Sequence, residues 1–315
     1  MLRKRTVIKV VAILFIIIFL GSCIGAYFWV SRIYVKNFAY RCTTDLNGLL
    51  RFSQLQGLTR ERHTFASNNG QTLVGYLYER EGVAAANKGI VVFAHGLGGG
   101  GQKGYVDIFD HLTKNGYYVF AYDATGNDES EGEVIGGLPQ GIIDLDFAID
   151  YVHTIEKTQS LPIMLMGYSW GGFSVVNVLN YHPEVQAVVS MAGFNKSMNL
   201  LEDRSCQVAG DLAKLVLPFA QIYEYSKYGK YALSSAMEGF ATSDCDVMIV
   251  HGQKDDIVPI EYGYDTYYKK YGNDERFRFC KYENRDHSIF TNDDGTLDFE
   301  LMNDAVEFFN QSLKK

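Results

Sequence analysis

The residues in this sequence that are best suited to chemistry begin with a serine between two glycines. Ser169 stands in Gly-Tyr-Ser-Trp-Gly (167–171), which follows the apolar run 163–166 and precedes a helical pattern. This order of strand, sharp turn and helix exposes a nucleophilic serine on a strained turn, and the flanking glycines allow the close backbone approach that such a turn needs. We therefore predict that Ser169 is a nucleophile.

A serine hydroxyl needs a base to take its proton and a carboxylate to orient that base. Asp255 comes in the loop after the apolar run 247–250, and His287 comes in the loop after the next strand-like run, 277–282. Adjacent strand ends would bring both side chains into one site. We expect His287 to be the base and a carboxylate of the first loop, Asp255 or its neighbour Asp256, to be the orienting acid.

A sheet of alternating strands and helices must position these residues. Residues 63–80 alternate apolar and polar side chains around Asn-Asn-Gly, which indicates a hairpin. The later pattern predicts an α/β fold with a mainly parallel sheet flanked by helices, in which ligands bind beyond the carboxyl ends of the strands. The expected strands lie near 89–94, 117–122, 163–166, 186–191, 246–250 and 277–282, and the expected helices near 103–115, 138–156, 171–181, 260–271 and 298–313.

Three further segments carry a family likeness. A strand precedes His-Gly-Leu-Gly (95–98), and Gly-x-x-Asp-x-x-Val-Pro occupies 252–259. Residues 122–132 are similar to D-x-R-G-x-G-x-S-x-G, although the arginine is absent. With the serine motif, these segments make the chain from about 60 to 313 resemble an α/β-hydrolase-fold serine hydrolase, similar to the serine aminopeptidase S33 and lysophospholipase branch of bacterial homologues.

This resemblance implies a set of roles, and it assigns the orienting acid to Asp255, with Asp256 as the alternative. The backbone N–H groups of Leu97 and Trp170 would form an oxyanion hole, and a helical cap would be inserted at about 195–243. The cap is rich in apolar residues and tyrosines, which favours an acyl ester or a lipid-like substrate. The candidate pocket residues are His95, Tyr168, Phe219 and Tyr223. For His95 and for His251, a loop-shaping imidazole is the favoured interpretation.

Two other functions stay open at this point. A peptidase that removes N-terminal residues would need a carboxylate for the substrate amine, and the candidates in the cap are Glu202, Asp203, Glu224 and Glu238. A non-catalytic binding protein on the same fold would have no need of a nucleophile, a base, an acid and an oxyanion loop together. Esterase activity through an acyl-enzyme is therefore the first hypothesis.

The N-terminus carries a different kind of segment. Residues 10–30 contain no charged residue and would reach about 31 Å as a helix, which matches a hydrocarbon core of roughly 30 Å. Tyr27, Phe28 and Trp29 gather at its far end, where aromatic rings favour the membrane interface. We expect a cytoplasmic N-terminus at 1–9, a transmembrane helix at 10–30, a juxtamembrane segment at 31–60 and a hydrolase domain at 61–315.

Three alternatives compete with a membrane anchor, and the basic cluster at the N-terminus argues against one of them, a buried core helix. A cleaved signal peptide usually has a shorter apolar stretch, of about 7 to 15 residues. A lipoprotein signal could end at Cys23, but strongly apolar residues follow that cysteine. Four basic residues precede the helix and three follow it, so the positive-inside tendency places the hydrolase domain outside the cytoplasm.

Composition excludes several other classes. The chain has 315 residues, a formal charge of −8, 47% hydrophobic residues and five cysteines, so it is neither a disordered chain nor a disulfide-dense scaffold. The first 50 residues carry +6, which leaves −14 for the rest, and such an acidic domain is a poor candidate for nucleic-acid binding. No HExxH or paired Cys-x-x-Cys spacing occurs, so we expect no metal site and no cofactor.

Overall fold

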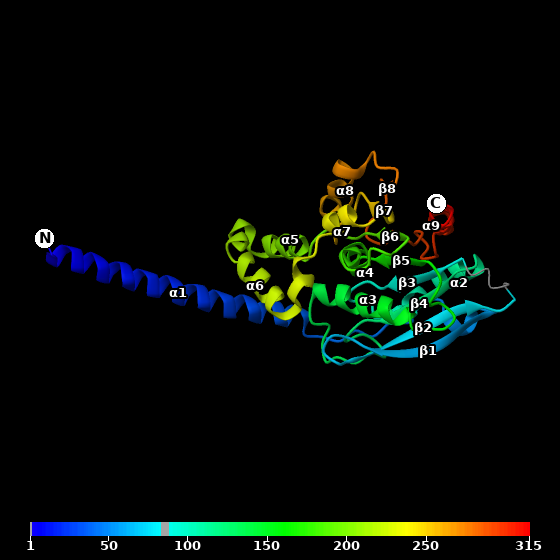
Figure 1. Cartoon of the computed structure of the whole chain (residues 1–315), viewed down its shortest axis with the longest axis horizontal. Coiled ribbons are helices and arrows are strands. Elements are labelled where there is room, and N and C mark those ends of the chain that lie inside the picture. Colours follow the sequence, from blue (N-terminus) through cyan, green and yellow to red (C-terminus); the bar gives the residue numbers. More distant parts are fainter. Residues whose placement is uncertain (1, 83–87) are drawn as a thin grey trace.

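The computed structural model describes residues 2–82 and 88–315. Met1, part of the expected N-terminal segment 1–9, and residues 83–87 of the expected hydrolase domain lie outside the described residues. The described chain forms one eight-stranded sheet (Figure 1). Its strands are β1 (Leu58–Ala66), β2 (Thr72–Arg80), β3 (Ile90–Ala94), β4 (Tyr118–Asp123), β5 (Ile163–Tyr168), β6 (Ala187–Met191), β7 (Asp246–Gly252) and β8 (Phe277–Tyr282).

The sheet has the order β1-β2-β4-β3-β5-β6-β7-β8. The hairpin strands β1 and β2 are antiparallel to each other, and β2 is antiparallel to β4, whereas the pairs from β4 to β8 are parallel. Continuous apolar runs fit this arrangement, since β3 and β6 are buried along their whole length. The predicted α/β fold with a mainly parallel sheet is confirmed, and the carboxyl ends of β5, β7 and β8 meet at one edge.

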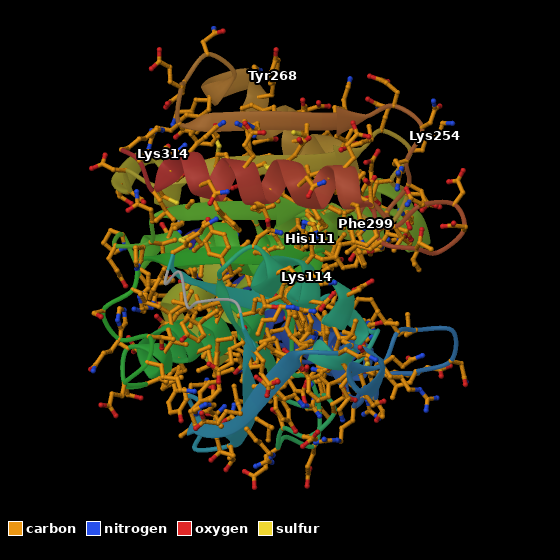
Figure 2. All side chains as sticks on the ribbon, turned by 90° about the vertical axis from the view of Figure 1, so that its right-hand side faces the viewer. His111, Lys114, Lys254, Tyr268, Phe299 and Lys314 are labelled. Atoms are coloured by element: carbon orange, nitrogen blue, oxygen red, sulfur yellow. The ribbon has the colours of Figure 1, made fainter. Side chains whose placement is uncertain are left out.

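Helices cover both faces of the sheet. On one face lie α2 (Val106–Lys114) and α9 (Phe299–Ser312), and Figure 2 views the molecule from the side of α9. On the other face lie α3 (Leu138–Val152), α4 (Trp170–Asn177) and α8 (Tyr264–Tyr271). Each face has its own core of buried apolar side chains, so α4, which follows Ser169, is held rigidly against the sheet. Short 3₁₀ segments connect these elements at Phe52–Gln54, Gln102–Tyr105, Val178–Asn180 and Ile260–Tyr262.

Between β6 and β7 the chain leaves the sheet and forms the helical segment that the sequence analysis places as a cap. Figure 1 shows α5 and α6 lying away from the strands, on the side of the molecule from which the N-terminal helix projects. The segment comprises α5 (Ser197–Ala209), η4 (Gly210–Leu215), α6 (Leu217–Tyr228), η5 (Gly229–Leu233) and α7 (Ala236–Thr242).

The N-terminal helix α1 (Leu2–Phe38) is longer than the predicted transmembrane helix 10–30. It continues eight residues beyond Val30 because no proline or glycine interrupts 31–38, and because Val30, Tyr34 and Phe38, spaced four residues apart, are buried on one face. Residues Thr6–Phe38 are long and apolar enough to cross a membrane, with a mean hydropathy of 2.9 and no burial in the most apolar window. Such a helix is a feature of membrane anchors and of signal sequences.

The chain that follows α1 is joined firmly to the sheet domain. The N–H of Cys42 donates to the carbonyl of Gly126 at 3.0 Å, and the N–H of Asp128 donates back to the carbonyl of Cys42 at 2.9 Å. The hydroxyl of Thr44 donates to the Asp128 carboxylate at 2.7 Å, and the guanidinium of Arg41 donates to backbone carbonyls of the same loop. These bonds fix the end of α1 relative to the loop 124–135.

Candidate active site

Ser169 occupies a strained turn between β5 and α4. Its φ is +55° and its ψ is −113°, a backbone conformation that non-glycine residues rarely adopt. The Ser169 N–H donates to the carbonyl of Met191 at 2.8 Å, and the Ser169 carbonyl accepts the N–H of Phe173 at 2.8 Å. These bonds to β6 and α4 hold the turn in place.

The two glycines of the motif are required by close packing. A Cβ on Gly167 would collide with the backbone carbonyl of Gly171, and a Cβ on Gly171 would collide with the backbone carbonyl of Ala94 at the end of β3. A larger residue at 171 would push the turn away from β3, and a larger residue at 167 would push the start of α4 away from β5.

The structure brings Ser169, His287 and Asp255 together. His287 Nε2 lies 2.9 Å from Ser169 Oγ, and His287 Nδ1 lies 2.8 Å from Asp255 Oδ2. The Asp255 side chain is fully buried, whereas that of His287 retains 16% exposure. Asp256, the alternative acid, is exposed. The geometry is that of a nucleophile, a base within hydrogen-bond reach and a carboxylate that orients the base.

Asp255 is held as an anion by its surroundings. Burial opposes its ionisation, but hydrogen bonds with His251 and His287 outweigh burial and hold the pKa of Asp255 well below its usual range. Its Oδ1 also accepts the N–H groups of Ile257 at 3.0 Å and Val258 at 2.8 Å. The carboxylate therefore remains charged at neutral pH and its orientation is fixed.

A cavity of about 820 Å³ opens over Ser169. The expected oxyanion residues Leu97 and Trp170 both line it, together with Tyr168, whose ring centroid lies 5.1 Å from that of His287. The Trp170 indole donates to the carbonyl of Leu138 at 2.8 Å, while its backbone N–H belongs to the first turn of α4, where such groups have no partner within the helix. That N–H is thus a suitable oxyanion donor.

Three of the four candidate pocket residues lie elsewhere. Among the described residues that line the cavity, Tyr168 is present and His95, Phe219 and Tyr223 are absent. His95 is buried, with Nδ1 donating to the carbonyl of Gly96 at 2.8 Å and Nε2 accepting the N–H of Ala124 at 3.0 Å. It shapes the loop behind Leu97. Tyr223 packs on α1 instead.

One wall of the cavity is formed by α1, which was not expected from the sequence. Because α1 continues beyond residue 30, its residues line the part of the cavity where cap residues were expected. The spacing of apolar residues within 30–38 is the sequence signal that could have predicted this longer helix. Arg204 of α5 also lines the cavity and donates to the carbonyl of Ile257 at 2.6 Å. The contributing α1 residues are Val30, Ile33, Tyr34, Asn37 and Phe38, and those of α5 and α6 are Leu200, Leu201, Arg204, Gln207, Val208 and Ala220.

The acidic residues proposed for a peptidase are not in this lining. Glu202, Asp203 and Glu238 are absent from the described residues that line the cavity, and so is Glu224. Glu224 is fully buried and accepts hydrogen bonds from Tyr34 and Ser197, both at 2.6 Å.

Comparisons with known proteins agree with this fold. Residues 85–238 match the family model described as serine aminopeptidase, S33; this segment contains Ser169 but neither Asp255 nor His287. The chain is similar to the quorum-quenching protein AidA of Acinetobacter baumannii (strain MDR-ZJ06), at 27% identity over 35% of this chain. The match spans 38% of that relative, well under its full length.

Solved structures share the architecture. The Pyrococcus furiosus esterase Pf2001 superposes with a TM-score of 0.62 at 15% identity, over 87% of this chain and 98% of the esterase. The Pyrococcus horikoshii acylaminoacyl peptidase superposes with a TM-score of 0.64 at 20% identity, over 86% of this chain and 44% of the peptidase. The chain has the α/β-hydrolase fold, and residues 85–238 carry its likeness to the serine aminopeptidase S33 family.

Proposed function

We propose that this protein hydrolyses carboxylic esters with hydrophobic acyl groups, by a Ser-His-Asp triad and an acyl-enzyme intermediate. The observation that carries the proposal is the hydrogen-bonded series from Ser169 through His287 to Asp255 at the floor of an apolar cavity. Ser169 Oγ attacks the ester carbonyl while His287 Nε2 takes its proton, and Asp255 stabilises the resulting imidazolium.

The chemistry then proceeds in two halves. The developing oxyanion is held by the N–H groups of Leu97 and Trp170, and one such donor is commonly worth about 2.7–4 kcal/mol of transition-state stabilisation. His287 returns the proton to the leaving alcohol, which leaves an acyl group on Ser169. Water then attacks this acyl-enzyme with His287 again as the base, and the carboxylic acid is released.

The cavity favours an ester with an apolar acyl group over a free N-terminal amine. Its lining is mostly apolar, and its charged side chain from the cap is the cation Arg204, which would repel a substrate ammonium. A peptidase that recognises a free amine would instead need a carboxylate in this space. The lining therefore supports the ester hypothesis.

A peptidase remains the second candidate because the matched family model and one structural neighbour carry peptidase names. Turnover of p-nitrophenyl esters with short and long acyl chains should be compared with that of aminoacyl and acylaminoacyl nitroanilides. The ester proposal predicts cleavage of the esters, with a preference for longer chains, and Ser169→Ala serves as the blank. Faster cleavage of the nitroanilides would support the peptidase.

We further propose that α1 is a membrane anchor with its N-terminus in the cytoplasm and the hydrolase domain outside. Support comes from the span Thr6–Phe38, from the basic residues ahead of it, and from the packing of Tyr34 and Phe38 into the domain. Cleavage of α1 as a signal peptide would remove part of the cavity wall, which favours a retained anchor.

A further inference from the structure

The tip of the cap exposes large apolar side chains. Val208 at the end of α5 is 89% exposed, and Leu212 and Leu215 of η4 are 73% and 72% exposed. Isolated exposed apolar residues are common, but three within eight residues of one protruding turn form a patch that soluble surfaces usually avoid. We call this patch the cap tip (Val208, Leu212 and Leu215). Its exposure indicates that it contacts an apolar surface outside this chain.

The cap tip lies on the side of the molecule that faces the N-terminal helix. The segment η4 joins α5 to α6, and in Figure 1 both helices lie where α1 leaves the sheet domain. The ring of Tyr223 in α6 lies 6.5 Å from that of Tyr27 and 5.1 Å from that of Tyr34, measured between centroids. The cap thus packs beside the last turns of the candidate membrane span.

The mouth of the cavity is at the same place. Ile33 of α1, Val208 of α5 and Ile257 after β7 line the cavity and remain 43%, 89% and 45% exposed, so they form its apolar rim. Ile33 is three residues beyond Val30, which is about 4.5 Å along a helix axis. If the span ends near residue 30, the rim lies at the depth of the lipid headgroups.

The charges around the cap tip are compatible with that position. Asp211 and Lys214 form an ion pair at 2.9 Å within η4, so this turn brings no unpaired charge to an interface. Arg32 and Lys36 of α1 are exposed just beyond the apolar span, where long basic side chains can reach lipid phosphates.

We propose that the cap tip inserts into the outer surface of the membrane that α1 spans, so that the cavity opens onto the bilayer and receives an amphiphilic ester directly from it. The acyl chain would pass the apolar rim between α1 and α5 and place its ester group at Ser169. The second half of this inference rests on the proposed hydrolase function, whereas the docking of the cap tip does not.

Docking can be tested without activity. The full chain carrying Trp29→Phe should be reconstituted into phosphatidylcholine vesicles, and a reporter tryptophan should be introduced as Leu212→Trp. The buried Trp170 stays in every variant, so its emission is measured in the Trp29→Phe chain alone and subtracted. The matched control is Phe299→Trp, since Phe299 is 57% exposed and lies on the far side of the molecule, which Figure 2 turns to the viewer. Dibrominated phosphatidylcholine should quench the reporter at 212 and leave the reporter at 299 unquenched. Equal quenching of the two reporters by the brominated lipid would overturn the docking.

Delivery from the bilayer can be tested by activity. The variant Leu212→Ser/Leu215→Ser should cleave a long-chain ester embedded in vesicles at least about fivefold more slowly, yet cleave a water-soluble short-chain ester within about twofold of the wild-type rate. Phe299→Ser should leave both rates unchanged. An equal effect on both substrates would contradict delivery from the membrane.

The two tests separate the possible failures. If neither ester is cleaved by the wild type, the hydrolase proposal fails while quenching still decides the docking. If the reporter at 212 is unquenched and chemical cross-linking gives a dimer through the cap, the occupant is a second copy of the chain and the membrane proposal is wrong.

Discussion

The hydroxyl of Tyr34 donates a 2.6 Å hydrogen bond to the carboxyl group of Glu224, which links the N-terminal helix to the cap across 190 residues of sequence. Ser197 donates to the other oxygen of the same carboxyl group, also at 2.6 Å. Glu224 is fully buried, so this contact is made away from water. It makes α1 a part of the active-site wall as well as a candidate anchor.

Replacement of this carboxyl group should change how stability depends on pH. Burial raises the pKa of Glu224 to about 7 from an ordinary value of 4.5, despite its two hydrogen bonds. The folded chain then keeps a proton that the unfolded chain releases, so the free energy of unfolding falls as pH rises from about 4.5 to about 7, by on the order of 3 kcal/mol. Glu224→Gln should remove this part of the decrease, as measured by thermal unfolding in detergent at several pH values.

The remaining pH dependence has an identifiable source. Burial also raises the pKa of Asp123 to about 7 and raises that of Asp144, so the slope should become smaller without disappearing. Glu238→Gln, at an exposed position of α7, is the matched control and should keep the wild-type slope. An unchanged slope in Glu224→Gln would mean that this carboxyl group is ionised throughout.

His251 should act as a positioning residue for Asp255. Its Nε2 lies 2.9 Å from the carbonyl of Val258 and 3.2 Å from Asp255 Oδ2, and its ring is fully buried. His251→Leu leaves both oxygens without this donor, which should cost about 1–3 kcal/mol of stability. We expect kcat on a soluble ester to fall about tenfold with little change in KM. His251→Gln, which keeps a donor, should recover most of the rate; equal losses in both variants would point to packing alone.

Gly171 should tolerate no side chain. Gly171→Ala would drive its Cβ into the carbonyl of Ala94 and so displace the turn that holds Ser169. We expect loss of ester turnover and a lower unfolding temperature. Gly104→Ala is the control, because its Cβ would meet atoms no closer than 3.8 Å. Wild-type activity in Gly171→Ala would show that the turn can relax away from β3.

Membrane orientation gives a separate prediction. Protease added to intact cells should digest the chain beyond about residue 38 while leaving the short N-terminal segment protected, because the basic residues before the apolar run favour the cytoplasmic side. An antibody to a C-terminal tag would follow the digestion. Full protection of the tag in intact cells, with digestion after lysis, would place the hydrolase domain inside.

The sequence was sufficient for the sheet and for the positions of the three reactive residues. Apolar runs such as 163–166 and 247–250 are buried strands, and in a parallel sheet their loops must meet at one edge. Ser169, Asp255 and His287 each follow such a strand, so their proximity could be expected from chain order and spacing, while the family likeness was needed to choose Asp255 over Asp256.

The cavity wall could not be predicted in the same way. Phe219 and Tyr223 were chosen for their types within the cap, but whether a cap side chain faces the cavity depends on what packs beside it. Here α1 packs against α6, and Tyr223 meets the ring of Tyr34 instead of a substrate. That contact joins segments almost 190 residues apart, and no local spacing indicates it.

Labelling by a fluorophosphonate probe, which reacts with an activated serine, directly tests whether Ser169 is a nucleophile activated by His287. The full chain in detergent should be treated with the probe, digested and analysed by mass spectrometry, with Ser169→Ala and His287→Ala alongside. We expect one adduct on Ser169 in the wild type, none at that position in Ser169→Ala, and labelling at least about a thousandfold slower in His287→Ala. A wild-type protein that stays unlabelled, or one that is labelled equally fast without His287, would contradict this expectation.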